Sequence, residues 1–236
     1  MKAFVKQLIP PLLWRFFERM NNKRRRYFGS YDLDRKLEKY LNYNDGYFVE
    51  LGANDGVNQS NTLYYERYKN WHGVLIEPTP HNYLLCRKNR SALSQVFCNA
   101  CVSFEYKEKF VEIVYSNLMS ASIGLESDII DPLAHAETGK EVFQQCDDNF
   151  IFGAAAKPLN SILNLAKAPH LIDLLSLDVE GAEIEVLKGI DFSQYKFKFM
   201  CIETRSKDKL VAYLASVGYR LVEQITGYDY LFSPNS

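Results

Sequence analysis

Short apolar runs that end in acidic residues and glycine recur along the chain. Residues 47–56 and 171–181 are the clearest examples, and each passes from an apolar run directly into a polar turn. A short apolar run bounded by turn residues is typical of a strand that is buried on both faces of a parallel sheet. In open parallel sheets, ligands bind outside the carboxyl ends of the strands. The pattern therefore predicts that the polar residues after both runs meet at one edge of a sheet.

Amphipathic segments alternate with further apolar runs along the rest of the chain. The pattern predicts helices over residues 31–41, 62–69, 80–89, 159–166, 182–188 and 207–217. It predicts strands over residues 46–51, 74–77, 95–103, 171–178, 197–202, 219–224 and 228–232. Strands that alternate with helices indicate an α/β fold with a doubly wound, Rossmann-like parallel sheet. The last two strands flank Thr226-Gly227 and are expected to form an antiparallel hairpin at the sheet edge.

The stretch from residue 116 to residue 157 interrupts this alternation. It is polar, has no long period, and contains Gly124, Pro132, Gly139 and Gly153. A loop of this length inside a compact domain is usually a lid, a binding element or a disordered segment. We treat residues 104–157 as an insertion, in which 110–115 alternates like a strand and 116–157 is a candidate substrate cover.

The first 30 residues have a charge of their own. They hold eight lysines and arginines and one glutamate, a net charge of +7 that leaves −8 for residues 31–236. Apolar residues recur from Leu12 to Met20 at helical spacing, which predicts a basic amphipathic helix within residues 1–28. Such a helix binds an anionic membrane surface, or else packs on its own domain or on a second subunit of a homo-oligomer. No apolar run approaches the roughly 18–20 residues of a transmembrane helix, and a cleavable signal peptide is not indicated.

Charge and cysteine usage narrow the class of protein. An acidic domain is a poor match for nucleic acid, whose phosphate backbone calls for a basic face. The five cysteines lack disulfide-framework spacing, and Cys98 and Cys101 lie in an expected strand without a second pair to complete a zinc site. We therefore expect free thiols and a cytoplasmic protein, peripheral on the inner face of the membrane if the arm binds lipid.

The loop at residues 52–56, Gly-Ala-Asn-Asp-Gly, indicates the kind of cofactor. A dinucleotide-binding loop reads Gly-x-Gly-x-x-Gly, but here Asn54 replaces the second glycine and Asp55 would repel a pyrophosphate. Glu77 ends the second strand, 21 residues after Gly56, where a carboxylate accepts hydrogen bonds from ribose hydroxyls. An acidic loop and a ribose-binding carboxylate favour a cationic nucleoside without phosphate, which is S-adenosylmethionine.

Residues 48–56, 73–78 and 175–189 together resemble the FkbM family of S-adenosylmethionine-dependent methyltransferases. The resemblance spans about residues 46–205, and Asp-Val-Glu-Gly-Ala-Glu at 178–183 is its most specific part. It implies a class I methyltransferase fold, with a seven-stranded sheet whose last strand is antiparallel, and methyl transfer to oxygen, typically a hydroxyl of a sugar or polyketide. By position it implies a cofactor site in which the loop binds the methionine end, Glu77 the ribose, and residues 99–100 the adenine. The expected cofactor contacts are Glu50, Gly52, Ala53, Asn54, Asp55, Gly56, Glu77, Asn99, Ala100 and Asp178.

Methyl transfer to a hydroxyl needs a base or a metal ion that lowers the pKa of the acceptor. Asp178, Glu180 and Glu203 follow two strands that should be neighbours, and three carboxylates on one edge could bind Mg²⁺. Alternatively, one of them acts as the base, with its pKa raised by the other two. Glu180 could instead cap the helix that follows it, and Glu203 could pair with a nearby cation. His81, close after the second strand, is a further candidate base.

These observations predict an S-adenosylmethionine-dependent O-methyltransferase that acts on a hydroxyl of a sugar, a glycan or a glycolipid precursor. Two other functions remain open at this point. One is a nicotinamide-dependent sugar oxidoreductase, against which the missing middle glycine counts. The other is a methyltransferase-like scaffold that binds ligands without catalysis.

Overall fold

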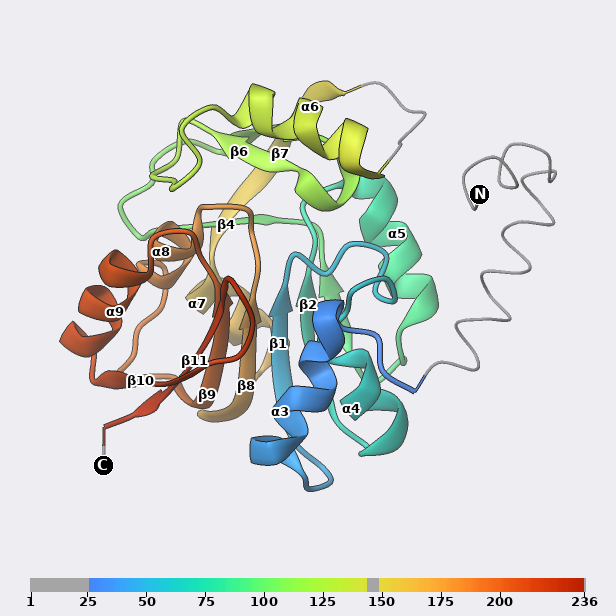
Figure 1. Cartoon of the computed structure of the whole chain (residues 1–236), viewed down its shortest axis with the longest axis vertical. Coiled ribbons are helices and arrows are strands. Elements are labelled where there is room, and N and C mark those ends of the chain that lie inside the picture. Colours follow the sequence, from blue (N-terminus) through green and yellow to red (C-terminus); the bar gives the residue numbers. More distant parts are fainter. Residues whose placement is uncertain (1–25, 144–148, 236) are drawn as a thin grey trace, which may run out of the picture.

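The computed structural model describes residues 26–143 and 149–235, with the side chains of 142–143 left out (Figure 1). Nearly all of the predicted N-terminal arm lies outside these ranges. Its last residues are described, and Phe28 is buried in the core beside the first helix. Within the described ranges, no helix is long and apolar enough to cross a membrane.

The larger of two sheets has seven strands in the order β10–β11–β9–β8–β1–β2–β3. Its strands are β1 (Tyr47–Leu51), β2 (His72–Ile76), β3 (Gln95–Phe97), β8 (Leu171–Leu177), β9 (Lys196–Glu203), β10 (Tyr219–Gln224) and β11 (Asp229–Pro234). The five strands from β3 to β9 are parallel, whereas β11 is antiparallel to both of its neighbours. The predicted doubly wound sheet with one antiparallel strand is confirmed. The antiparallel strand, β11, is second from the edge of the sheet, because β10 occupies the edge.

Helices cover both faces of this sheet, and each begins and ends within two residues of its predicted bounds. They are α3 (Leu33–Leu41), α4 (Leu63–Tyr68), α5 (Pro80–Asn89), α7 (Leu159–Ala166), α8 (Glu183–Leu187) and α9 (Lys207–Ser216). Successive side chains of a strand point to opposite faces. Phe48 of β1 therefore packs with the α3 and α4 side, and Val49 packs with α7, α8 and α9. Burial on both faces explains the unbroken apolar runs in the sequence.

The expectation of one strand over residues 95–103 is wrong, because the chain leaves the larger sheet after Phe97. Residues 98–99 form an irregular link, and β4 (Ala100–Val102) pairs in parallel with β7 (Phe150–Pro158) in a second sheet. The Asn99 side chain donates a hydrogen bond to the Ala155 carbonyl at 3.0 Å, which holds the link against β7. One apolar run of the sequence thus supplies a strand to each of the two sheets.

The described residues of the insertion form a layer of helix and sheet, and several of them line the cavity described below, as expected of a substrate cover. Its parts are β5 (Phe110–Tyr115), the 3₁₀ turn η2 (Asn117–Met119), β6 (Ala121–Ile123), α6 (Pro132–Phe143) and β7. With β4 they form a four-stranded sheet in the order β4–β7–β5–β6, and α6 packs on it through Ala136. We call this sheet and α6 the cap. Figure 1 shows the cap at the top of the view, beyond the carboxyl ends of the central strands.

A buried ion pair fixes the segment between β1 and α4. Glu50, in β1, is 4% exposed, and its Oε2 lies 3.1 Å from Nη1 of Arg90, whose side chain is fully buried. The Glu50 carboxylate also accepts hydrogen bonds from the Asn61 backbone N–H at 2.9 Å and from the Ser60 hydroxyl at 3.1 Å. A buried charge of this kind is tolerated because every partner is in place. The pair therefore ties the loop after β1 to the end of α5.

We expect Arg90→Met to lower the free energy of unfolding by about 3–5 kcal/mol, because it leaves the Glu50 carboxylate buried without its cation. Urea unfolding followed by circular dichroism measures the change. The matched control is Arg87→Met on the exposed side of the same helix, which we expect to cost less than about 0.5 kcal/mol. Equal losses in the two variants would show that the buried pair has no special role.

Candidate active site

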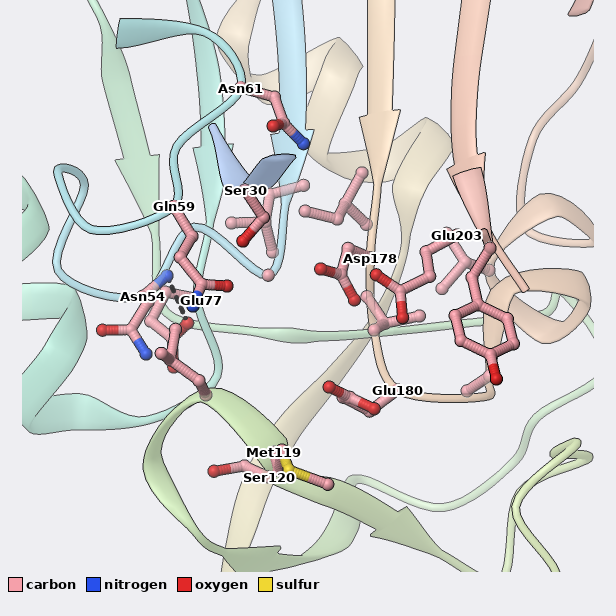
Figure 2. A pocket seen from close by; sticks show the side chains of 18 of the residues that line it. Ser30, Asn54, Gln59, Asn61, Glu77, Met119, Ser120, Asp178, Glu180 and Glu203 are labelled. Carbon is pink, nitrogen blue, oxygen red and sulfur yellow. Dashed lines mark hydrogen bonds between the residues drawn. The ribbon is translucent and has the colours of Figure 1, made fainter. Parts of the chain in front are cut away.

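A cavity of about 1210 Å³ lies between the carboxyl ends of the central strands and the cap. Residues of β1, β2, β9 and the cap line it, together with residues 178–180 directly after β8, so the runs at 47–56 and 171–181 do meet at one edge (Figure 2). Eight of the predicted site residues line the cavity: Gly52, Asn54, Glu77, Asn99, Ala100, Asp178, Glu180 and Glu203.

Gly52 lies where the end of β1 almost touches the end of β8. Its φ is +76°, and a Cβ added there would lie 1.9 Å from the Asp178 carbonyl oxygen. The Asp178 N–H donates in turn to the Leu51 carbonyl at 3.4 Å. Only glycine fits this backbone contact, which sets the cofactor loop directly beside Asp178.

Glu77 holds the loop from the other side. Its Oε2 accepts a hydrogen bond from the Asn54 N–H at 2.8 Å, and its Oε1 accepts one from the Thr79 N–H at 2.9 Å (Figure 2). Burial raises the pKa of Glu77, and the two N–H donors oppose that rise. The Asn54 side chain donates to Asn117 of η2 at 3.0 Å, so the same loop also contacts the cap.

Five predicted site residues do not line the cavity, and local geometry explains each case. The Glu50 carboxylate faces Arg90, and Ala53 is buried in the core. The Asp55 carboxylate accepts the N–H groups of residues 57 and 58 and so caps its own turn. Gly56 has a φ of +78° and packs on Cys86 and Arg90. These four residues support the loop and do not line the cavity, so their expected contact with the cofactor stays a prediction.

His81 is the fifth of these residues. It is exposed in the first turn of α5, and it is not among the residues that line the cavity. His81 follows Glu77 closely in the sequence, which suggested that its ring could reach the edge of the cavity. The helix directs the ring into solvent instead. The geometry does not support His81 as the base.

Asp178 and Glu203 are partly buried carboxyl groups on the same wall of the cavity, and Figure 2 shows both near Glu180. Burial, together with the charges of Glu203 and Glu180, raises the pKa of Asp178 well above its usual value. Burial, then Glu180 and Asp229, raises the pKa of Glu203 to about 7. A carboxyl group with such a pKa exchanges a proton near neutral pH, which suits a general acid or base.

Glu180 differs from its two neighbours because its charge is paired. Its Oε2 lies 3.0 Å from Nε2 of His135, in α6, and 3.0 Å from Nη2 of Arg205, after β9. Its φ of +52° is uncommon for a residue other than glycine. His135 lies in a stretch for which the sequence predicted no helix, so its contact with Glu180 through α6 was not foreseen.

The predicted Mg²⁺ site is not supported. Across residues 26–143 and 149–235, no group of three or more His, Cys, Asp or Glu side chains is arranged to hold a metal ion. Glu180 points one oxygen at two cationic or hydrogen-bonding partners, which removes it from a shared carboxylate cluster with Asp178 and Glu203.

Asp128 attaches the cap to the turns after β8 and β9, a role that no sequence pattern indicated. Its Oδ2 accepts hydrogen bonds from the Arg205 N–H at 2.8 Å and the Ser206 N–H at 3.0 Å. Its own N–H donates to the Gly181 carbonyl at 3.0 Å. These contacts join the cap to the turns that follow both β8 and β9, so the cavity wall is built from segments about 50–80 residues apart in sequence.

We expect Gly52→Ala to unfold at lower urea concentration and to lose cofactor affinity, because its methyl group collides with the Asp178 backbone. The matched control is Gly218→Ala, which has a φ of +89° but open space around its Cβ position. The control should lose only about 1–2 kcal/mol from its left-handed backbone conformation. If Gly52→Ala costs no more than the control, the close approach does not constrain the site.

One family model matches most of the chain. The family described as the Methyltransferase FkbM domain matches residues 50–221. Two solved structures are similar at low identity. A precorrin-6y C5,15-methyltransferase from Geobacter metallireducens is 11% identical with a TM-score of 0.41, over 87% of this chain and 89% of that one. A SAM-dependent methyltransferase from Aquifex aeolicus is 12% identical with a TM-score of 0.36, over 98% of this chain and 96% of that one.

Neither structural likeness is close enough to carry an argument, and the search of curated proteins gives no match. The family match alone covers more than half of the chain. It includes the loop at residues 52–56, Glu77, and the three carboxyl groups of Asp178, Glu180 and Glu203. The chain therefore belongs to the FkbM family of S-adenosylmethionine-dependent methyltransferases.

Proposed function

We propose that this methyltransferase acts on a hydroxyl oxygen of a sugar, a glycan or a glycolipid precursor. The observation that carries the proposal is Glu203, a partly buried carboxyl group on the cavity wall with a pKa raised to about 7. A hydroxyl acceptor requires a base, and the pKa of an effective base lies near the working pH. An acceptor that is already nucleophilic would not need such a group.

The cavity suits S-adenosylmethionine by its charge and by its unpartnered polar atoms. Its lining includes the carboxyl groups of Glu77, Asp178, Glu180, Glu203 and Asp229 but only two cations, Lys36 and Arg205. Asn61 Oδ1 lines the cavity and is buried without a hydrogen-bond partner among the described residues. An acceptor atom in an acidic cavity can receive a hydrogen bond from the ammonium group of the cofactor.

The residues of this chain then have distinct tasks. When bound, S-adenosylmethionine supplies a methyl group on a positively charged sulfur, which an oxygen nucleophile can attack directly. Glu77 and the loop at residues 52–54 hold the cofactor beside Asp178. The Glu203 carboxylate accepts the proton of the acceptor hydroxyl as the new C–O bond forms. The charge of Glu180, which is paired with His135 and Arg205, raises the pKa of Glu203 and so favours transfer of that proton to it.

The basic arm supports the glycolipid part of the proposal. Residues 26–29 lead directly into Ser30 and Tyr31, and both of these line the cavity. An arm that binds anionic lipid would therefore hold the mouth of the cavity close to a membrane surface. Peripheral membrane contact through residues 1–28 is a prediction that vesicle sedimentation of the full chain and of a chain lacking those residues can test.

We expect Glu77→Gln to weaken S-adenosylmethionine binding at least about tenfold, because an amide cannot accept from both the Asn54 N–H and the Thr79 N–H. Isothermal titration calorimetry with S-adenosylmethionine and S-adenosylhomocysteine measures the change. Glu112→Gln, an exposed position on β5, serves as the matched control and should bind normally. Unchanged binding by a folded Glu77→Gln variant would remove Glu77 from the cofactor site.

We expect the kcat of the wild type to rise with pH through about 7, and Glu203→Gln to lower kcat about 100-fold or more and abolish that rise. The same substitution should stabilise the protein at pH 8. A carboxyl group whose pKa is raised in the folded state contributes stability below its unfolded pKa, and this contribution is lost as the pH rises toward 7. Urea unfolding at pH 5 and pH 8 tests the sign. A variant that retains the pH dependence of the wild type would exclude Glu203 as the base.

A further inference from the structure

Two exposed tyrosines line the cavity without contributing to the core. Tyr31 is 83% exposed and Tyr228 is 58% exposed. Neither hydroxyl group donates or accepts a hydrogen bond within the described ranges of the chain. Large aromatic rings that line a cavity and remain in solvent are available to pack on a ligand.

The backbone of Tyr31 is strained. Its φ is +52° and that of Asp32 is +57°, two successive left-handed residues that are not glycine. A bulky side chain in this region is an outlier. Of the nine described non-glycine residues with positive φ, five line the cavity: Tyr31, Asn54, Gln59, Asn117 and Glu180. Such strain collects at ligand-binding sites, where the surrounding structure keeps a side chain in a useful place.

Specific contacts hold the strained turn in position. The Phe28 N–H donates to the buried Asp34 carboxylate at 2.6 Å, and Gly29 forms a β-bridge with Gln59. Phe28 and Leu33 are each only 2% exposed. The turn is therefore fixed at both ends, and Tyr31 projects from it at the cavity although nothing in the core requires an aromatic ring there.

Tyr228 is held beside the proposed base. Its carbonyl accepts a hydrogen bond from the Thr204 N–H at 3.0 Å, and the next residue, Asp229, pairs directly with Glu203 across the two strands. The ammonium group of Lys36, in α3, donates to the Ile225 carbonyl at 3.3 Å. This contact joins the helix that follows Tyr31 to the turn that carries Tyr228, so both rings belong to one connected part of the cavity mouth.

We propose that Tyr31 and Tyr228 form an aromatic clamp that binds the ring of the acceptor and thereby determines which hydroxyl reaches Glu203. The C–H groups of a pyranose ring pack on aromatic faces, while its hydroxyl groups reach polar atoms around it. Ser122 Oγ, which lines the cavity and is buried without a partner in the described part of the chain, is one such atom. This inference rests on the proposed function.

The test begins with a panel of methyl pyranosides of the gluco, galacto, manno, rhamno and fuco configurations. The full-length wild type receives each glycoside with S-adenosylmethionine that carries tritium in its methyl group, and label in the glycoside is counted. For the best acceptor, KM and kcat are then measured for Tyr31→Ala, Tyr31→Phe, Tyr228→Ala and Tyr228→Phe. Tyr68→Ala, an exposed tyrosine outside the cavity, is the matched control.

We expect each alanine variant to raise KM for the glycoside roughly tenfold or more, with kcat and the Kd for S-adenosylmethionine within about threefold of wild type. The phenylalanine variants keep the ring and should keep KM within about threefold, as should Tyr68→Ala. Saturation-transfer NMR of the glycoside with the alanine variants should show the matching loss of signal from its ring protons.

Three results would overturn the clamp. KM values that stay at the wild-type level in both alanine variants would show that the rings do not bind the acceptor. A parallel loss of S-adenosylmethionine affinity would assign the rings to the cofactor. The wild type could also bind S-adenosylmethionine but show neither methyl transfer nor saturation transfer with any glycoside of the panel. That result would exclude a pyranose as the ligand of the clamp, while the proposal of methyl transfer to another hydroxyl would stand. A folded wild type that binds no S-adenosylmethionine would contradict the proposed function itself.

Discussion

The backbone contact between the ends of β1 and β8 is the constraint on which the site depends. Gly52 approaches the Asp178 carbonyl so closely that no side chain fits between them. This contact brings the loop that holds the cofactor and the first rim carboxylate into one place, on two parallel strands that are buried on both faces. The Glu50–Arg90 ion pair also fixes this loop, and so do the two hydrogen bonds that the Glu77 carboxylate accepts.

Asp178, Glu180 and Glu203 lie partly buried near one another at the edge of the cavity, which is unfavourable for folding. Burial and mutual repulsion raise the pKa values of Asp178 and Glu203. The apolar layers on both faces of the sheet offset this cost, since they make the strands that carry the carboxyl groups hard to displace. A fold that paired each of these groups with its own cation would be more stable but would not raise the pKa of Glu203 to about 7.

The cap turns an open sheet edge into an enclosed cavity. Asp128 attaches the cap to the turns after β8 and β9. His135, which lies in α6, pairs with Glu180. The cofactor loop contacts the cap as well, through Asn54 and Asn117. The cavity is therefore lined by three separate segments, namely the cap, the turn before α3 and the turn before β11, which all lie at the ends of the same strands.

The sequence by itself determined the larger sheet, the helices on both faces, and the meeting of residues 52–56, Glu77 and Asp178 at one edge. These features follow from local periodicity and from the rule that parallel strands end on the same side. Only the tertiary structure decided the rest. It split the run at 95–103 between two sheets, folded the insertion through pairing of β5 with β7, and turned Glu50 toward Arg90 and His135 toward Glu180. Each of these outcomes depends on contacts between residues far apart in the chain, and the local pattern of apolar and polar positions carries no record of such partners.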